Sequence, residues 1–181
     1  MSTVNVFAIG NGESRKGVDL STLRQYGRIY GCNALYRDFI PSVLVAADPE
    51  MRKEILAATN KVAHPILNGW SSGPSAVAYA AAEADLNGRV FLLGFDLYGV
   101  NGKHNNIYKG TDNYRDADEP ATHCGNWVNQ LGIVFRENRF ITFFRVGREN
   151  DPMPAQWQGL DVKFISYAEM WKLLRNEGGC G

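Results

Sequence analysis

The most informative segment of the chain is Val4-Asn5-Val6-Phe7-Ala8-Ile9-Gly10-Asn11-Gly12-Glu13-Ser14. Its first six residues form an apolar run that predicts a buried β-strand, and a short helical pattern follows the two glycines. Glycine lets the backbone approach a ligand closely, and the start of a helix carries partial positive charge. We therefore expect the turn at Gly10, Asn11 and Gly12 to offer backbone N–H groups to a phosphate.

Strands and helices alternate along the rest of the chain. Apolar runs predict strands at 4–9, 28–32, 43–47, 89–93, 140–145 and 162–165, with a short further strand at 62–64. Helical patterns cover residues 20–25, 34–39, 49–59, 73–86, 123–137 and 167–175. This alternation predicts an α/β fold, a Rossmann-like, mostly parallel sheet with helices on both faces. We expect the 181 residues to form a single domain, because no linker or repeat interrupts the pattern.

Composition narrows the class of protein. Nineteen basic and nineteen acidic side chains give a formal net charge of zero, which disfavours a strongly basic nucleic-acid surface. No apolar run approaches the roughly 20 residues that span a bilayer, and the first residues lack the pattern of a secretion signal. Cys32, Cys124 and Cys180 show no metal-type spacing and cannot all pair. We therefore expect a cytoplasmic protein without a nucleic-acid or membrane partner.

Polar clusters follow the predicted strands at the points where the strands end. They are Gly10-Asn11-Gly12, Asn33, Asp48, the turn Ser71-Ser72-Gly73, and Gly94-Phe95-Asp96-Leu97-Tyr98. Ligands of open parallel sheets bind outside the carboxyl ends of the strands, so we expect the clusters to form one nucleotide site. Taken singly, each cluster is also what an ordinary turn requires. The aperiodic segment 94–122, rich in Gly, Asn and Asp, is typical of a functional or mobile loop.

Two familiar nucleotide motifs are missing from the sequence. The dinucleotide pattern G-x-G-x-x-G is broken at Arg15, and the second predicted strand ends at Asn33 instead of an acidic residue that would hold a ribose. The segment Arg15-Lys16-Gly17 does not supply the Gly-Lys-Ser/Thr of a P-loop. The sequence therefore disfavours NAD-dependent and P-loop chemistry.

The ordered motifs resemble those of sialyltransferase-like glycosyltransferases, above all the bacterial lipooligosaccharide type that uses CMP-activated sialic acid. That family carries G-N-G-P-S, C-N, T-S-G and G-[IF]-D-x-Y in this order, and the likeness covers residues 4 to about 144. It implies transfer of a sugar from a nucleotide-activated, CMP-sugar-like donor to an acceptor hydroxyl, without metal or cofactor. A weaker likeness extends to archaeal pterin diphosphokinases on a similar fold.

The resemblance also implies which residues bind the donor. They are Gly10, Asn11, Gly12, Ser14, Asn33, Asp48, Ser71, Ser72, Gly73, Gly94 and Asp96. Asn11 and Asn33 would hold the nucleotide and its phosphate. Ser71 and Ser72 would receive the sugar carboxylate, because free N–H groups at a helix start favour an anion.

Three further residues would be catalytic by the same resemblance. Tyr98 and Tyr108 would stabilise charge on the leaving phosphate. His123 follows the long loop and precedes a predicted helix, where the dipole favours a neutral imidazole that can accept a proton from the acceptor. His64 and His104 lack comparable support.

Departures from the family pattern leave the donor and acceptor open. Asp48 replaces an asparagine, and a carboxylate near a sugar phosphate repels it unless it meets a hydroxyl, an amine or a metal. Only 22 residues, 49 to 70, stand where the family has a larger insertion, so a homo-oligomer could complete the acceptor side. The donor could be another nucleotide sugar. The segment Asp116-Ala117-Asp118 is interpreted as a charged loop surface, and we expect no metal.

Two alternative functions remain open at this stage. The first is a non-catalytic protein that binds a nucleotide or a nucleotide-derived signal, which the small size favours. The second is a diphosphokinase-like transferase that uses Asp48 with a divalent ion. Turnover of a nucleotide sugar would separate the glycosyltransferase from the first alternative, and dependence on added magnesium would separate it from the second.

Overall fold

The computed structural model describes residues 3–121, 124–148 and 151–177. Six strands form one sheet in the order β3-β2-β1-β4-β5-β6, and every pair of neighbouring strands is parallel. The strands are β1 (Asn5–Ile9), β2 (Gly27–Cys32), β3 (Val43–Val45), β4 (Arg89–Leu93), β5 (Thr142–Gly147) and β6 (Val162–Ser166). The predicted α/β fold with a parallel sheet is therefore confirmed. This strand order is the one found in dinucleotide-binding α/β folds.

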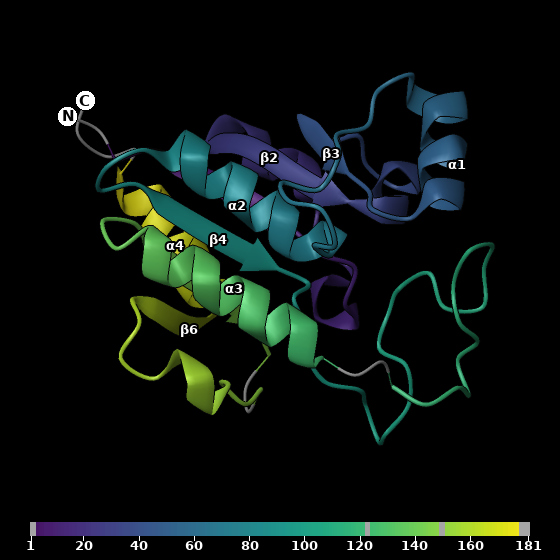
Figure 1. Ribbon diagram of the computed structural model, residues 1–181. Helices are drawn as coiled ribbons and strands as arrows, with labels where there is room; N and C mark the ends of the chain where they lie inside the picture. The colour runs from purple at the N-terminus through teal and green to yellow at the C-terminus, as the bar shows by residue number, and fades with distance from the viewer. Residues whose placement is uncertain (1–2, 122–123, 149–150, 178–181) are drawn as a thin grey trace.

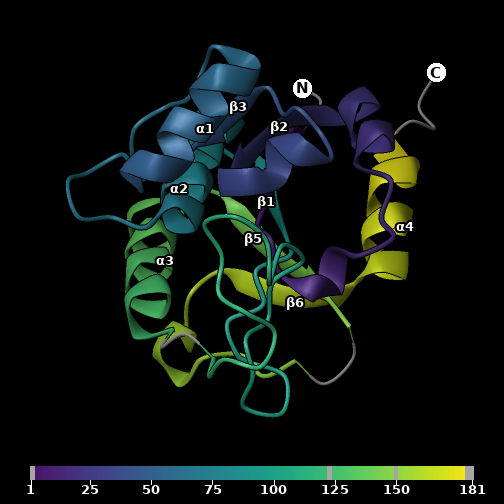
Figure 2. The same cartoon turned by 90° about the vertical axis from the view of Figure 1, so that its right-hand side faces the viewer.

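Helices cover both faces of the sheet. In Figure 1 α2 and α3 lie side by side on one face, and in Figure 2 α4 lies on the opposite side. The α-helices are α1 (Pro49–Thr59), α2 (Ser72–Ala84), α3 (Gly125–Glu137) and α4 (Tyr167–Glu177). Short 3-10 helices are η1 (Glu13–Arg15), η2 (Leu20–Gln25), η3 (Asn33–Arg37) and η4 (Ala155–Trp157). Among the described helices none is long and apolar enough to cross a bilayer.

The two faces of the sheet bury different side chains because neighbouring residues of a strand point to opposite sides. Val6 and Ala8 of β1 belong to the core under α2 and α3. Phe7 and Ile9 belong to the core that Met170 of α4 helps to form. The alanine-rich surface of α2 lets this helix pack closely on the central strands. These two cores fix the strands whose carboxyl ends form the site.

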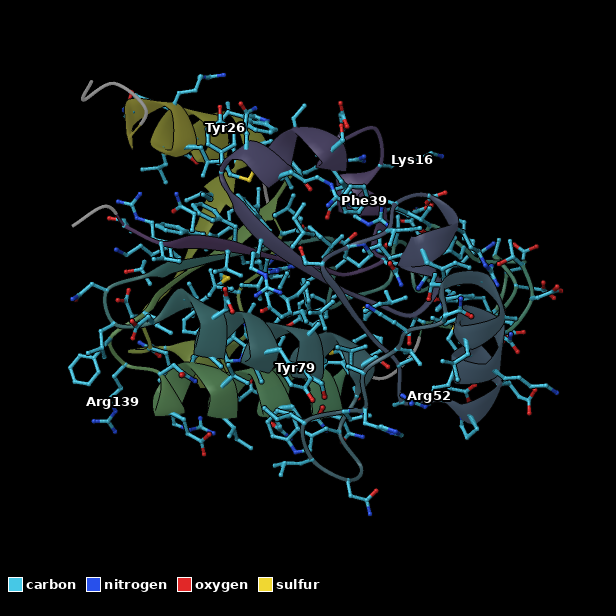
Figure 3. All side chains as sticks on the ribbon, turned by 90° about the horizontal axis from the view of Figure 1, so that it is seen from above. Lys16, Tyr26, Phe39, Arg52, Tyr79 and Arg139 are labelled. Carbon is cyan, nitrogen blue, oxygen red and sulfur yellow. The ribbon has the colours of Figure 1, made fainter. Side chains whose placement is uncertain are left out.

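The connection between α1 and α2 is held to its neighbours by two long side chains, both labelled in Figure 3. Arg52 of α1 donates to the carbonyl oxygens of Ala46 and Ala63, at 3.0 and 2.8 Å. Tyr79 of α2 donates its hydroxyl to the carbonyl oxygen of His64, at 3.1 Å. The strand predicted at 62–64 reduces to a single bridge between Val45 and Ala63.

The strand order reverses between β1 and β4, since β1 is followed outward by β2 and β3 and β4 by β5 and β6. At this switch point the two backbones touch at Gly10 and Gly94. A Cβ on Gly10 would lie 2.5 Å from the Gly94 carbonyl oxygen, and a Cβ on Gly94 would lie 2.6 Å from the Gly10 carbonyl oxygen. Gly94 also has φ +71°, which L side chains rarely adopt. Glycine is therefore required at both positions.

The long loop, residues 94–121, lies across the carboxyl ends of the strands (Figure 2). It is anchored from several sides. The Ile107 N–H donates to the Asn11 carbonyl oxygen at 2.8 Å, and the Lys109 ammonium group pairs with the Glu13 carboxylate at 2.7 Å. The Asn113 amide donates to the Glu54 carboxylate of α1 at 2.7 Å. This loop, aperiodic in sequence, is therefore bonded to the rim of the sheet.

Candidate functional site

A cavity of about 340 Å³ opens at the switch point, between the carboxyl ends of β1–β4, the start of α2 and the long loop. Its volume is at the lower end of the roughly 300–1,000 Å³ typical of small-molecule sites. Of the eleven residues predicted to bind substrate, ten line this one cavity: Gly10, Asn11, Gly12, Asn33, Asp48, Ser71, Ser72, Gly73, Gly94 and Asp96. The clusters at the strand ends therefore do come together.

Four predicted site residues do not appear in the described cavity wall. Ser14 donates its N–H and its hydroxyl to the carboxylate of Asp96, the first at 2.8 Å, and so supports the wall from behind. Tyr98 is 40% exposed and is not among the lining residues. His123 lies outside the described residues, and the helix that follows it in sequence contributes Trp127 to the wall.

Tyr108 is the fourth of these residues, and it is buried away from the cavity. Its hydroxyl donates to the Asp38 carboxylate at 2.6 Å and accepts from the Arg15 guanidinium at 3.1 Å. Burial and the hydrogen bond to Asp38 raise the pKa of Tyr108 to about 12. The phenol is therefore neutral, and it links the long loop to Asp38 and Arg15.

The turn after β1 does not present the free N–H groups expected of a phosphate cradle. The N–H groups of Gly10 and Gly12 donate to the carbonyl oxygens of Leu93 and Gly94, both at 2.8 Å. The Glu13 N–H donates to the Asn105 side chain, at 2.9 Å. In the described structure only the Asn11 N–H of this turn keeps no partner. The expectation is wrong because the ends of β1 and β4 approach closely enough to bond to each other.

Asn11 and Asn33 play different parts in the wall. The Asn11 amide donates to the Cys32 carbonyl oxygen at 3.1 Å and to the Tyr114 hydroxyl at 3.3 Å. Its own carbonyl oxygen accepts from the buried Arg15 guanidinium at 3.2 Å. Asn11 thus ties β1, β2 and the long loop together. Asn33 is half-buried, and its side chain has no hydrogen bond within the described structure, so its amide is available to a ligand.

The start of α2 has more than one N–H group without a described partner, unlike the turn after β1. The Ser72 and Gly73 N–H groups lie in the first helical turn, where no carbonyl of the helix can accept them, and neither has another partner in the described structure. The Ser72 hydroxyl accepts from the Ala47 N–H at 2.9 Å and fixes the helix against the end of β3. Ser71 lines the cavity, and its hydroxyl has no hydrogen bond to a described residue. A thirteen-residue helix adds its dipole, so this end favours an anion.

The described part of the wall carries two carboxylates, and no lysine, arginine or histidine. Both oxygens of Asp96 accept hydrogen bonds from Ser14. Asp48 uses Oδ1 to accept from the Met51 N–H at 2.9 Å, and its Oδ2 has no hydrogen bond to a described residue. Burial raises the pKa of Cys32 to about 12, so its thiol stays neutral. The described residues contain no group of three or more His, Cys, Asp or Glu arranged to hold a metal.

Several lining residues had no signal of their own in the sequence. They are Ala47, Met51, Pro74, Asn105, Asn106, Asn113, Tyr114 and Trp127, whereas the lining residues Cys32, Phe95 and Leu97 belong to motifs recognised in the sequence. The composition of the long loop was a partial signal, since three asparagines and a tyrosine of that loop reach the wall. Trp127 gave none, because a tryptophan on an amphipathic helix is more often a core residue.

Comparison with protein-family models, with curated proteins and with solved structures finds no significant match. The cavity and the motif residues that line it are therefore the observations that bear on function.

Proposed function

We propose that the cavity binds a nucleotide-activated sugar and that the protein is a glycosyltransferase. The observation that carries this proposal is the convergence of ten motif residues, from position 10 to position 96, on one cavity at the switch point of the sheet. Ligands of open α/β sheets bind at such a point. The order of these motifs resembles that of sialyltransferase-like glycosyltransferases, which supports the transfer of a sugar in particular.

Within this proposal the donor phosphate lies at the start of α2. The Ser72 and Gly73 N–H groups and the Ser71 hydroxyl supply donors there, and the helix dipole favours the negative charge. The aromatic rings of Tyr114 and Trp127 provide the kind of surface against which a base stacks.

The proposed chemistry is the transfer of a glycosyl group from a phosphate oxygen of the donor to a hydroxyl oxygen of the acceptor. His123 removes the proton of an acceptor hydroxyl, the acceptor oxygen forms a bond to the anomeric carbon, and the bond from that carbon to the phosphate oxygen breaks. The nucleotide leaves with the bonding electron pair as an anion held at the start of α2. Tyr98 and Tyr108 have no part in this step, since neither lines the described wall.

A variant of the general base tests the transferase directly. We expect His123→Ala to lower donor hydrolysis or transfer by at least about 100-fold, because a positioned base contributes roughly 10²–10⁴-fold. The thermal shift caused by CMP, UDP, GDP or ATP, whichever the wild type binds, should persist. His64→Ala is the control, because His64 is an exposed histidine outside the cavity wall. Wild-type turnover in His123→Ala would refute the mechanism.

One observation favours a second function, the non-catalytic binding of a nucleotide or nucleotide signal. The two phenols expected to stabilise the leaving phosphate, Tyr98 and Tyr108, are not among the lining residues, and no cationic side chain lines the described part of the wall. Stabilisation of the charge that develops on a leaving group would then rest mainly on the N–H groups and the dipole at the start of α2. Tight stoichiometric binding of a nucleotide by the wild type, with no turnover of any nucleotide sugar, would establish this function.

A further inference from the structure

We propose that Asp48 selects the sugar of the donor, accepting a sugar that presents a hydroxyl or amine at this place and excluding one that presents a carboxylate. The inference rests on the proposed nucleotide-sugar binding and deepens it by naming the class of sugar. It runs against the acidic sugar that the motif resemblance implies.

Asp48 lines the cavity with one carboxylate oxygen bonded to the protein and the other without a hydrogen bond to a described residue. It lies three residues after the end of β3 at Val45 and precedes Pro49, the first residue of α1. Oδ1 accepts from the Met51 N–H at 2.9 Å, which fixes the orientation of the carboxylate, while Oδ2 has no hydrogen bond to a described residue. The residue is exposed and lines the cavity. A carboxylate oxygen only accepts hydrogen bonds, so its natural partner is a hydroxyl or ammonium group.

Asp48 forms no ion pair with a described residue; its one side-chain hydrogen bond within the described structure is the cap of α1. Arg52, one helical turn later, directs its guanidinium to the carbonyl oxygens of Ala46 and Ala63 and to the His64 ring. It forms no ion pair with Asp48. The other carboxylate of the wall, Asp96, has the same sign.

Arg15 and Arg145, two cations near the cavity wall, are also bonded to the protein, and Arg145 donates to the Phe95 and Pro152 carbonyl oxygens. The Arg15 guanidinium lies behind the wall and donates to the Gly10 carbonyl oxygen at 2.6 Å, to the Asn11 side chain and to the Tyr108 hydroxyl. Within the described wall, the start of α2 is the place where unpaired N–H groups are reinforced by a helix dipole, and the proposal places the donor phosphate there. A sugar carboxylate would be a second anion and would face Asp48 without compensation.

The expected size of this discrimination follows from Coulomb's law. Two like charges about 5 Å apart, at an effective dielectric between that of a protein surface and that of water, change an affinity roughly tenfold. The hydrogen bond that a hydroxyl would donate to Oδ2 acts in the same direction. We therefore expect a neutral sugar conjugate to bind roughly tenfold more tightly than its carboxylate counterpart.

Matched donor pairs measure this preference by titration calorimetry. The pairs are UDP-glucose with UDP-glucuronic acid, and CMP-sialic acid methyl ester with CMP-sialic acid, because each pair differs only at the carboxylate. The wild type should prefer the neutral member of the pair whose nucleotide it binds. Asp48→Asn should abolish the preference while α1 stays capped, because asparagine caps a helix as well as aspartate does.

Asp19→Asn is the matched control. Asp19 caps η2 through Oδ1, which accepts from the Ser21 N–H at 2.9 Å, and it lies outside the cavity wall. In Asp19→Asn the ratio of affinities for the neutral and the carboxylate conjugate should equal that of the wild type. Unfolding midpoints should show that each variant folds.

Three results would overturn the inference. Equal or tighter binding of the acidic member by the wild type would do so, as would an unchanged ratio in Asp48→Asn; both leave nucleotide binding intact. If none of the four conjugates binds and no nucleotide shifts the melting temperature, the proposed function fails, and this inference fails with it.

Discussion

The backbone contact between Gly10 and Gly94 can be tested with a single methyl group. Gly94→Ala places a Cβ 2.6 Å from the Gly10 carbonyl oxygen and 3.0 Å from its carbonyl carbon, at φ +71°. Gly69→Ala is the matched control, because Gly69 has φ +80° and nothing lies within 4 Å of a Cβ built there. Both variants place alanine in the left-handed region, but only Gly94→Ala adds a collision with backbone.

The two losses of stability can be worked out separately. Alanine in the left-handed region costs about 1–2 kcal/mol, partly offset by about 0.4–1 kcal/mol from the less flexible unfolded chain. Gly69→Ala should therefore lose about 1 kcal/mol. Overpacking adds about 1–3 kcal/mol, so Gly94→Ala should lose about 2–4 kcal/mol. For a chain of this size that corresponds to a melting temperature lowered by about 4–16 °C.

Urea unfolding, followed by tryptophan fluorescence, measures both free energies of unfolding. Because Gly94 also lines the cavity, a nucleotide that shifts the melting temperature of the wild type should shift that of Gly94→Ala less, while Gly69→Ala should respond like the wild type. Equal losses of stability in the two variants would show that the β1 and β4 ends are not in contact, and the described cavity would then be wrong.

Two further predictions concern the long loop. Glu54 is partly buried, which raises its pKa, but hydrogen bonds from Tyr36, Arg37 and Asn113 outweigh this effect and lower the pKa. Because the Glu54 carboxylate holds Asn113 of the long loop, Glu54→Gln should speed amide exchange in residues 105–114. The control Glu83→Gln, which removes a surface ion pair with Arg28, should not. Burial, and then Arg115, lowers the pKa of His104, so the stability it contributes is present above about pH 6.5 and declines as the pH falls. Replacing His104 by glutamine should flatten this decline in unfolding free energy between pH 7 and pH 5, and an unaltered slope would contradict it.

The sheet could be predicted from the sequence because buried parallel strands are short apolar runs, and these runs need no long-range information. The short helices were harder. Residues 20–25 and 34–39 form 3-10 helices, η2 and η3, since segments this short lack the length that stabilises an α-helix. The strand predicted to end at residue 145 runs to Gly147. Arg145 is 2% exposed there, because its guanidinium donates to the Phe95 and Pro152 carbonyl oxygens.

The site was predictable where it follows from topology and not where it depends on the path of the loop. Ligands bind at the carboxyl ends of parallel strands, so the order of the strands in the sequence was enough to predict that Asn33, Asp48 and Ser71 share one site. The contribution of Tyr114 could not be predicted, because an aperiodic segment gives no register from which to place a side chain. Tyr108 shows the same limit, since its burial depends on Asp38 and Arg15, neither of which belongs to a recognised motif.

The motif residues divide into two groups with different physical tasks. The Gly10 N–H and the Asn11 side chain form hydrogen bonds within the protein, and Ser14 donates two hydrogen bonds to Asp96. The start of α2, Asn33 and Asp48 line the cavity and have donors and one acceptor without a partner among the described residues. Changes in the first group should therefore alter stability and ligand binding together, because they loosen the wall. Changes in the second group should alter affinity at nearly constant stability, and that contrast separates a residue that builds the site from one that binds the ligand.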